Sequence, residues 1–173
     1  MTLANKITLL RIVLIPVFII GLLEGADPWP LYVFLFCVLT DFLDGFVARM
    51  RRQKTTLGTF LDPLADKLLL NAAFLVLAFQ DRVPGWVFVT VFSRDLLILL
   101  GWNLLFVLTR SSTINPRWLG KSTTAAQMIC VAVHLLPVAP PALFAVTGIM
   151  AAVTVLSTFD YVWLGGRRLN QLD

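Results

Sequence analysis

Charged residues are scarce in this sequence of 173 residues, because they make up 14% of it while apolar residues make up 58%. A typical water-soluble chain has about 25% charged and roughly 45–50% apolar residues. The composition therefore excludes a water-soluble enzyme and predicts an integral membrane protein.

Histidine and cysteine are also rare, with one and two residues respectively. Cys37 and Cys130 both lie in apolar runs, which argues against a disulfide framework and predicts small packing residues. His134 lies near the end of an apolar segment, and we expect it to be a hydrogen-bonded residue rather than a metal ligand. The scarcity of thiol and imidazole groups disfavours a zinc centre.

The basic residues do not form a nucleic-acid-binding pattern, although the formal net charge is +4. They lie in short clusters between apolar segments, and no basic polar face separates the aromatic residues. No nucleic-acid partner is predicted.

Six apolar segments approach the length of about 20 residues that crosses the roughly 30 Å hydrocarbon core of a bilayer. Connections rich in proline and glycine separate several of them. Because the chain shows no internal repeat or linker, we expect an all-α membrane protein with a single domain over residues 1–173. The segments are Thr8–Leu23, Leu31–Arg49, Phe60–Phe79, Trp86–Leu108, Trp118–Leu136 and Pro141–Leu164.

Positive charge alternates between the connections of these segments. Basic residues lie near the N-terminus, in the second-to-third and fourth-to-fifth connections and in the tail, whereas the remaining connections hold only Arg82. The positive-inside rule then predicts six transmembrane helices with both termini in the cytoplasm. A signal peptide is the alternative for the first segment, but the residues that follow it make a poor cleavage site.

Four aspartates lie close together in the second and third segments, at positions 41, 44, 62 and 66. A carboxylate at the centre of a bilayer costs about 2.5–3.5 kcal/mol, so a cluster needs compensating partners. Asp41 and Asp44 share one helical face, and Asp62 and Asp66 share a face of the next helix. Because the two helices are antiparallel, we expect all four carboxylates at matched depth near the cytoplasmic side.

Oxygen ligands of this kind favour Mg²⁺, Mn²⁺ or Ca²⁺. Four carboxylates can bridge two such ions, an arrangement that suits a phosphoryl displacement. The small residues Gly45, Ala48 and Gly58 lie near the acids. They are compatible either with close helix packing or with room for a planar ligand and a phosphate.

From Asp41 the chain reads Asp-Phe-Leu-Asp-Gly-Phe-Val-Ala-Arg, and Gly58, Asp62 and Asp66 follow at fixed intervals. This pattern over residues 41–66 resembles the signature of the CDP-alcohol phosphotransferase family. The resemblance implies an enzyme that transfers a phosphatidyl group from CDP-diacylglycerol to an alcohol and releases CMP. It also implies a site in a polar cavity of the helix bundle that opens to the cytoplasm.

The same resemblance implies roles for individual residues. Asp41, Asp44, Asp62 and Asp66 would bind Mg²⁺ (two ions, with Mn²⁺ as a substitute), and Asp66 would also act as the general base. The residues implied to contact the CDP-lipid are Asn5, Thr8, Gly45, Ala48, Arg49, Thr55 and Gly58.

The acceptor alcohol is less tightly specified. The stretches Asn5–Pro16 and Leu61–Leu70 resemble phosphatidylglycerophosphate synthases, which use glycerol 3-phosphate, and we favour this acceptor. Ser93–Leu97 instead resembles eukaryotic-type cardiolipin synthases, whose acceptor is phosphatidylglycerol. The basic residues implied for an anionic acceptor are Arg94, Arg110 and Lys121, although Arg94 has a structural ion pair with Asp95 as its alternative role.

A cation transporter is the alternative from a different class, because clustered intramembrane carboxylates also mark ion paths. The acids gather near one side of the membrane and no repeat is found, which disfavours that interpretation. The resemblance further implies a homodimer, and we expect a multi-pass protein of a bacterial inner membrane, surrounded by lipid.

Overall fold

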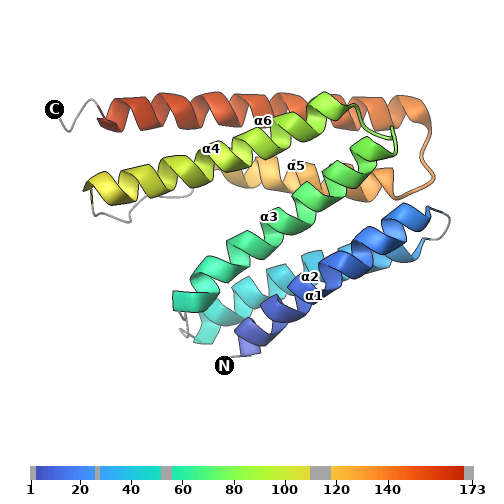
Figure 1. Cartoon of the computed structure of the whole chain (residues 1–173), viewed down its shortest axis with the longest axis horizontal. Helices are drawn as coiled ribbons and strands as arrows, with labels where there is room; N and C mark the ends of the chain where they lie inside the picture. Colours follow the sequence, from blue (N-terminus) through green and yellow to red (C-terminus); the bar gives the residue numbers. More distant parts are fainter. Residues whose placement is uncertain (1–2, 26–27, 52–55, 110–117, 170–173) are drawn as a thin grey trace.

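The computed structural model describes the backbone of residues 3–25, 28–51, 56–109 and 118–169, and the side chains of residues 7–25, 28–42, 64–101 and 118–164. All regular structure in these ranges is α-helical (Figure 1). The helices in chain order are α1 (Leu3–Glu24), α2 (Trp29–Arg51), α3 (Thr56–Phe79), α4 (Gly85–Thr109), α5 (Trp118–His134) and α6 (Pro140–Leu169).

Each predicted apolar segment corresponds to one helix, so the prediction of an all-α chain with six helices is confirmed. Prolines mark the helix starts as expected, since Pro30 lies in the first turn of α2 and Pro140 begins α6. Gly25 follows α1 with φ of 76°, a left-handed conformation that glycine adopts without steric cost. The prolines and the glycine that the sequence placed between apolar segments therefore lie at the observed helix ends.

Apolar side chains cover much of the outer surface of the bundle. Phe79, Phe144 and Phe159 are more than 70% exposed, which is typical of a surface that contacts lipid. Within the described residues, two helices contain stretches long and apolar enough to cross a membrane, at Ile7–Glu24 in α1 and Pro140–Leu164 in α6. These features support a membrane protein, while the six-span topology stays a prediction.

Helix α3 runs through the middle of the bundle and contacts α1, α4 and α5 (Figure 1). Helices α4 and α5 both pack against α6. In the described part of the chain, α2 makes its main close backbone contacts with α1 and a smaller number with α5. Helix α1 packs against both α2 and α3.

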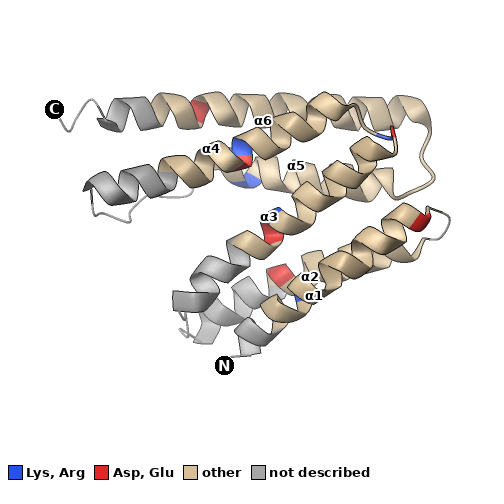
Figure 2. Ribbon diagram, in the orientation of Figure 1, with Lys and Arg blue, Asp and Glu red and all other residues tan. Residues whose placement is uncertain are grey.

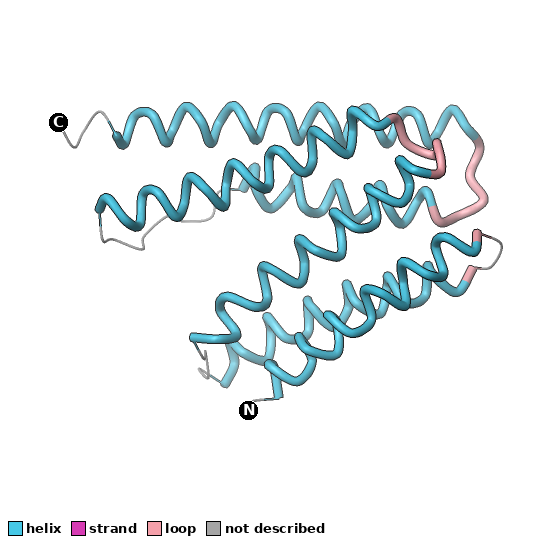
Figure 3. Tube along the Cα trace, in the orientation of Figure 1, coloured by secondary structure: helices cyan, strands magenta, loops and turns pink. Residues whose placement is uncertain are grey.

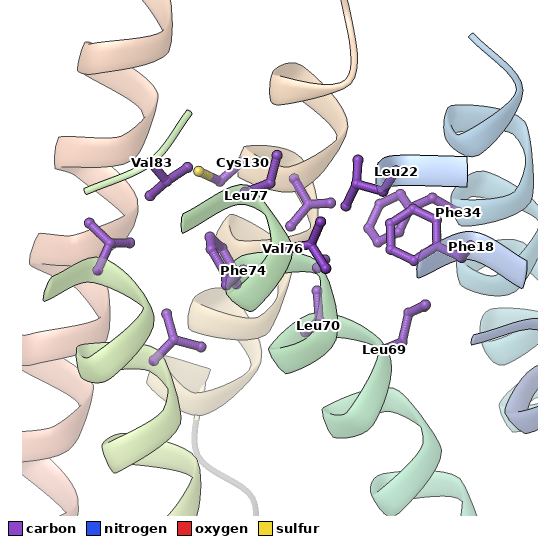
Figure 4. Packing of buried hydrophobic residues seen from close by; sticks show 14 of the residues in the cluster. Phe18, Leu22, Phe34, Leu69, Leu70, Phe74, Val76, Leu77, Val83 and Cys130 are labelled. Atoms are coloured by element: carbon purple, nitrogen blue, oxygen red, sulfur yellow. The ribbon is translucent and has the colours of Figure 1, made fainter. Parts of the chain in front are cut away.

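The apolar core forms around α3 (Figure 4). Leu69, Leu70, Phe74 and Leu77 are almost fully buried and recur with helical spacing. They pack against buried residues of α1, α2, α4 and α5. Among these residues, the rings of Phe18 on α1 and Phe34 on α2 lie 5.7 Å apart. Because lipid is as apolar as these side chains, the core stabilises the fold mainly through close van der Waals packing.

The described loops gather at one end of the bundle (Figure 3). At this end Gln80 Nε2 donates a hydrogen bond to the carbonyl of Leu22, 2.6 Å away, and Arg82 donates one to the carbonyl of His134. A cavity of about 330 Å³ lies here, with Leu22, Arg82 and several prolines in its lining. None of the predicted site residues whose side chains the structure describes is among the lining residues of this cavity.

Candidate active site

An ion pair joins α1 to α2 at the first predicted metal ligand. Nη1 of Arg11 donates to Oδ1 of Asp41 at 2.7 Å. The Arg11 side chain is 1% exposed, whereas that of Asp41 is 35% exposed. A buried guanidinium requires such a partner, and the carboxylate that provides it remains accessible. Thr8, one turn before Arg11, is also fully buried.

Asp66 lies on α3 within electrostatic reach of two groups of charges. It interacts with Asp41 and Arg11 from α2 and α1, and with Lys67 and Asp95 from α3 and α4. The structure therefore brings together Asp41 and Asp66, which the sequence placed on facing helices. Helix α1 contacts both α2, which carries Asp41, and α3, which carries Asp66.

A second cluster of charges centres on Asp95 and is buried between α3, α4 and α6. Oδ1 of Asp95 accepts hydrogen bonds from Nζ of Lys67 and Nη1 of Arg94, both at 2.8 Å. Oδ2 accepts one from Nδ2 of Asn71 at 3.1 Å. Arg94 Nη2 also lies 3.4 Å from Oγ of Ser157 on α6. We call this group, which consists of Lys67, Asn71, Arg94, Asp95 and Ser157, the Asp95 cluster.

The charged residues of both groups come from the neighbouring helices α1, α2, α3 and α4. In Figure 2 the charged positions of α2, α3 and α4 lie along the helices, away from the loops that connect α3 to α4 and α5 to α6. Buried charges in a bundle this apolar are expected to be paired. The most deeply buried of these charges, Arg11, Arg94 and Asp95, are all paired.

The predicted acceptor residues occupy different environments. Arg94 is 3% exposed and forms the ion pair with Asp95 that the sequence left as its alternative role. Lys121 is exposed at the start of α5, with Nζ 5.7 Å from the centre of the Trp118 ring. The adjacent Gly120 lies against the Asp95 cluster, because a Cβ placed on it would be 3.6 Å from Nη2 of Arg94.

Several predicted site residues lie outside the side chains that the structure describes. Within the described side chains, no group of three or more His, Cys, Asp or Glu residues comes together. Two of the four predicted metal ligands belong to the undescribed set, so the complete ligand set stays a prediction. The residues concerned are Asn5, Asp44, Gly45, Ala48, Arg49, Thr55, Gly58, Asp62 and Arg110.

The described carboxylates fit a divalent cation. Asp41 and Asp66 come from different helices and interact electrostatically, and one of them is accessible at its surface. Carboxylate oxygens are the ligands that Mg²⁺ and Mn²⁺ prefer. A cation between them would also offset their mutual repulsion.

Sequence reasoning missed the contributions of Arg11, Lys67 and Asn71, and treated Asp95 only as a partner of Arg94. A usable signal existed, because Arg11 and Lys67 both lie within predicted spans, where an ionisable residue indicates a specific partner. The identity of that partner requires the packing of α1 on α2 and of α3 on α4. Spacing along one chain does not supply it.

The predicted hydrogen bonding of the histidine and the predicted packing of the cysteines are confirmed. His134 is buried, and its Nδ1 lies 2.8 Å from the carbonyl oxygen of Cys130. Cys37 and Cys130 are free and buried in the core.

Comparison with known proteins identifies relatives over most of the chain. The family model described as CDP-alcohol phosphatidyltransferase matches residues 1–159. The chain is 37% identical over 180 aligned positions to the Bacillus subtilis protein named "CDP-diacylglycerol--glycerol-3-phosphate 3-phosphatidyltransferase", with 92% of each chain covered. It is 36% identical over 132 positions to the Escherichia coli protein of the same name, with 73% of this chain and 72% of that protein covered.

A mycobacterial relative gives a similar result. The protein from Mycobacterium tuberculosis named "Probable phosphatidylglycerophosphate synthase" is 34% identical over 171 positions, with 92% of this chain and 79% of that protein covered. All three names describe the same class of phosphatidyl transfer.

Proposed function

Because the chain belongs to the CDP-alcohol phosphatidyltransferase family, we propose that it transfers a phosphatidyl group from CDP-diacylglycerol to glycerol 3-phosphate. The products are phosphatidylglycerophosphate and CMP. The names of the Bacillus subtilis and Escherichia coli relatives support this acceptor over phosphatidylglycerol. The enzyme would act in phospholipid biosynthesis.

The observation that carries the proposal is the electrostatic interaction between Asp41 on α2 and Asp66 on α3 inside an apolar bundle. Two carboxylates in electrostatic contact suit a divalent cation and a substrate that brings phosphate. Arg11 holds Asp41 through an ion pair of 2.7 Å, which orients that carboxylate. We extend the same ligand role to Asp44 and Asp62.

Asp66 is the proposed general base. Its carboxylate takes the proton from the acceptor hydroxyl while the hydroxyl oxygen forms a bond to the phosphatidyl phosphorus. The bond from that phosphorus to the bridging oxygen breaks, and CMP leaves with the electron pair. Bound Mg²⁺ would supply electrostatic stabilisation of the charge on the diphosphate.

The remaining assignments follow the family pattern and the membrane setting. We propose that Thr8, together with the signature residues from Gly45 to Gly58 and Asn5, contacts the CDP-lipid. Arg94, Arg110 and Lys121 supply positive charge on the acceptor side. The chain would span a bacterial inner membrane six times as a homodimer, with both termini and the site facing the cytoplasm, where CMP is released.

The decisive test measures CMP release and the mass of the lipid product with purified protein in detergent micelles. CDP-diacylglycerol and Mg²⁺ are supplied with glycerol 3-phosphate or, separately, with phosphatidylglycerol. We expect phosphatidylglycerophosphate from the first mixture only. Cardiolipin from the second mixture alone would overturn the proposed acceptor, and no CMP release from either would overturn the proposed activity.

The assigned base is tested by Asp66→Asn, which keeps the side-chain shape and removes the proton acceptor. We expect a loss of about a hundredfold to ten-thousandfold in the rate of CMP release. Asp81→Asn is the matched control, because Asp81 lies in the loop between α3 and α4 and asparagine tolerates its positive φ of 56°. Retention of activity in the Asp66 variant would show that another group is the base.

A further inference from the structure

The lysine that directly follows Asp66 is the accessible cation of the Asp95 cluster. The side chain of Lys67 is 22% exposed, whereas those of Arg94 and Asp95 are both 4% exposed. Part of the Lys67 side chain is therefore accessible, while that of Arg94 is covered. Lys67 also interacts electrostatically with Asp66, so its charge lies beside the proposed base.

The two cations of the cluster share one carboxylate. Lys67 and Arg94 each carry one positive charge, and both bind the same carboxylate oxygen of Asp95 at 2.8 Å. The Asp66 carboxylate also interacts with Lys67. Because Asp66 would bind a metal ion in the proposed reaction, Lys67 can offer its remaining N–H donors to an anion of the substrate.

We propose that Lys67 binds the phosphate of the acceptor alcohol and that Asp95 is the positioning residue that holds its ammonium group for this contact. The inference rests on the proposed function and adds a substrate contact to it. An ammonium group has three N–H donors. Nζ of Lys67 can keep its hydrogen bond to Asp95 while it donates another to a phosphate oxygen.

This contact orients the acceptor for the reaction. Lys67 and Asp66 are adjacent in α3. When the phosphate of glycerol 3-phosphate is bound at Lys67, the hydroxyl at the other end of the molecule can therefore turn toward the Asp66 carboxylate. Fixing one end of the substrate in this way reduces the entropy that the reaction must lose. Asn71, which donates to Asp95 at 3.1 Å, helps to fix that carboxylate from one helical turn further along α3.

The first test is the KM for glycerol 3-phosphate, measured from initial rates of CMP release at saturating CDP-diacylglycerol. Loss of a charged hydrogen bond predicts that Lys67→Met raises this KM by about tenfold to a hundredfold, with kcat much less affected. Lys67→Arg keeps the charge and should restore most of the affinity. If the methionine variant does not fold, Lys67→Gln provides the same measurement.

The second test separates positioning by Asp95 from a merely structural role. We expect Asp95→Asn to raise the KM for glycerol 3-phosphate, and we expect this effect to shrink in the Lys67→Met background, because the residue acts through Lys67. Equal effects of Asp95→Asn in both backgrounds would contradict the positioning role.

The outcomes distinguish this inference from the proposed function. If the wild-type protein released no CMP with glycerol 3-phosphate, the proposed function itself would fall. If the wild-type protein were active and Lys67→Met left the KM unchanged, the assignment of Lys67 alone would be overturned. An increase in KM with Lys121→Met but not with Lys67→Met would move the phosphate contact to the start of α5.

Discussion

Two groups of paired charges flank Asp66, and they expose opposite signs. In the pair between α1 and α2, the cation Arg11 is buried at 1% exposure and the anion Asp41 is accessible at 35%. In the Asp95 cluster, the anion is buried at 4% and the cation Lys67 is accessible at 22%. The buried partner of each pair therefore holds the accessible partner in place.

The sign of the accessible charge indicates which ligand each side accepts. An accessible carboxylate next to Asp66 attracts a divalent cation, whereas an accessible ammonium group attracts a phosphate. Asp66 interacts electrostatically with both sides. A base in that position can take a proton from an acceptor held on the basic side, while the donor diphosphate is bound with metal on the acidic side.

The largest expected effect comes from removal of the buried anion. Asp95→Ala leaves Lys67 and Arg94 without their shared partner, and breaking a buried ion pair in this way costs about 3–5 kcal/mol. Asp41→Ala should lower stability less, because it leaves one cation, and Arg11 still interacts with Asp66. Thermal unfolding of both variants in the same detergent measures the difference, and an equal loss would contradict the contrast between the two sides.

The next effect concerns the accessible anion. Asp41→Asn retains the shape of the side chain but removes the charge that attracts the cation, so we expect activity to fall on the order of a hundredfold. Higher concentrations of Mg²⁺ should recover part of the loss. Rates measured across a Mg²⁺ titration check this expectation, and an unchanged Mg²⁺ dependence would show that Asp41 is not a metal ligand.

A smaller effect is expected from the cation that orients Asp41. Arg11→Met removes the hydrogen bond of 2.7 Å, and loss of a group that orients a metal ligand reduces activity by about tenfold or somewhat more. Arg11→Lys should retain part of the activity, because it keeps the charge with a different geometry. Equal rates for the methionine variant and the wild type would show that Asp41 needs no such support.

The smallest effect is expected at the edge of the Asp95 cluster. Asn71→Ala removes one hydrogen bond to Asp95 and one to the carbonyl of Lys67, so the free energy of unfolding should fall by about 1–2 kcal/mol. The KM for glycerol 3-phosphate should rise only slightly, because Lys67 and Arg94 still bind Asp95. A rise as large as that expected for Lys67→Met would assign Asn71 a direct substrate contact.

The helices could be predicted from the sequence because each is a long apolar segment that ends at proline, glycine or polar residues. Pro140 begins α6 and Gly25 follows α1, as these residue types require. The pairing of Asp41 with Asp66 was also predictable, since helical spacing and a tight connection place both acids at similar depth. These features depend on local sequence and on one antiparallel turn.

The Asp95 cluster could not be predicted in the same way. Its members come from α3, α4 and α6, and the order in which these helices pack is not encoded in the spacing along any one of them. The sequence adjacency of Arg94 and Asp95 indicated one ion pair. It did not indicate that Lys67 shares the same carboxylate oxygen, nor that Arg11 pairs with Asp41.

The most direct test of the contrast between the two sides uses the variants Asp41→Asn and Lys67→Met. For each variant, the rate of CMP release is measured in one titration with Mg²⁺ and in another with glycerol 3-phosphate. We expect the Asp41 variant to need more Mg²⁺ with an almost unchanged KM for glycerol 3-phosphate. We expect the Lys67 variant to have a raised KM for glycerol 3-phosphate with an almost unchanged need for Mg²⁺. If both variants shifted both requirements equally, or if the two dependences were exchanged, the assignment of metal and phosphate to opposite sides of Asp66 would be contradicted.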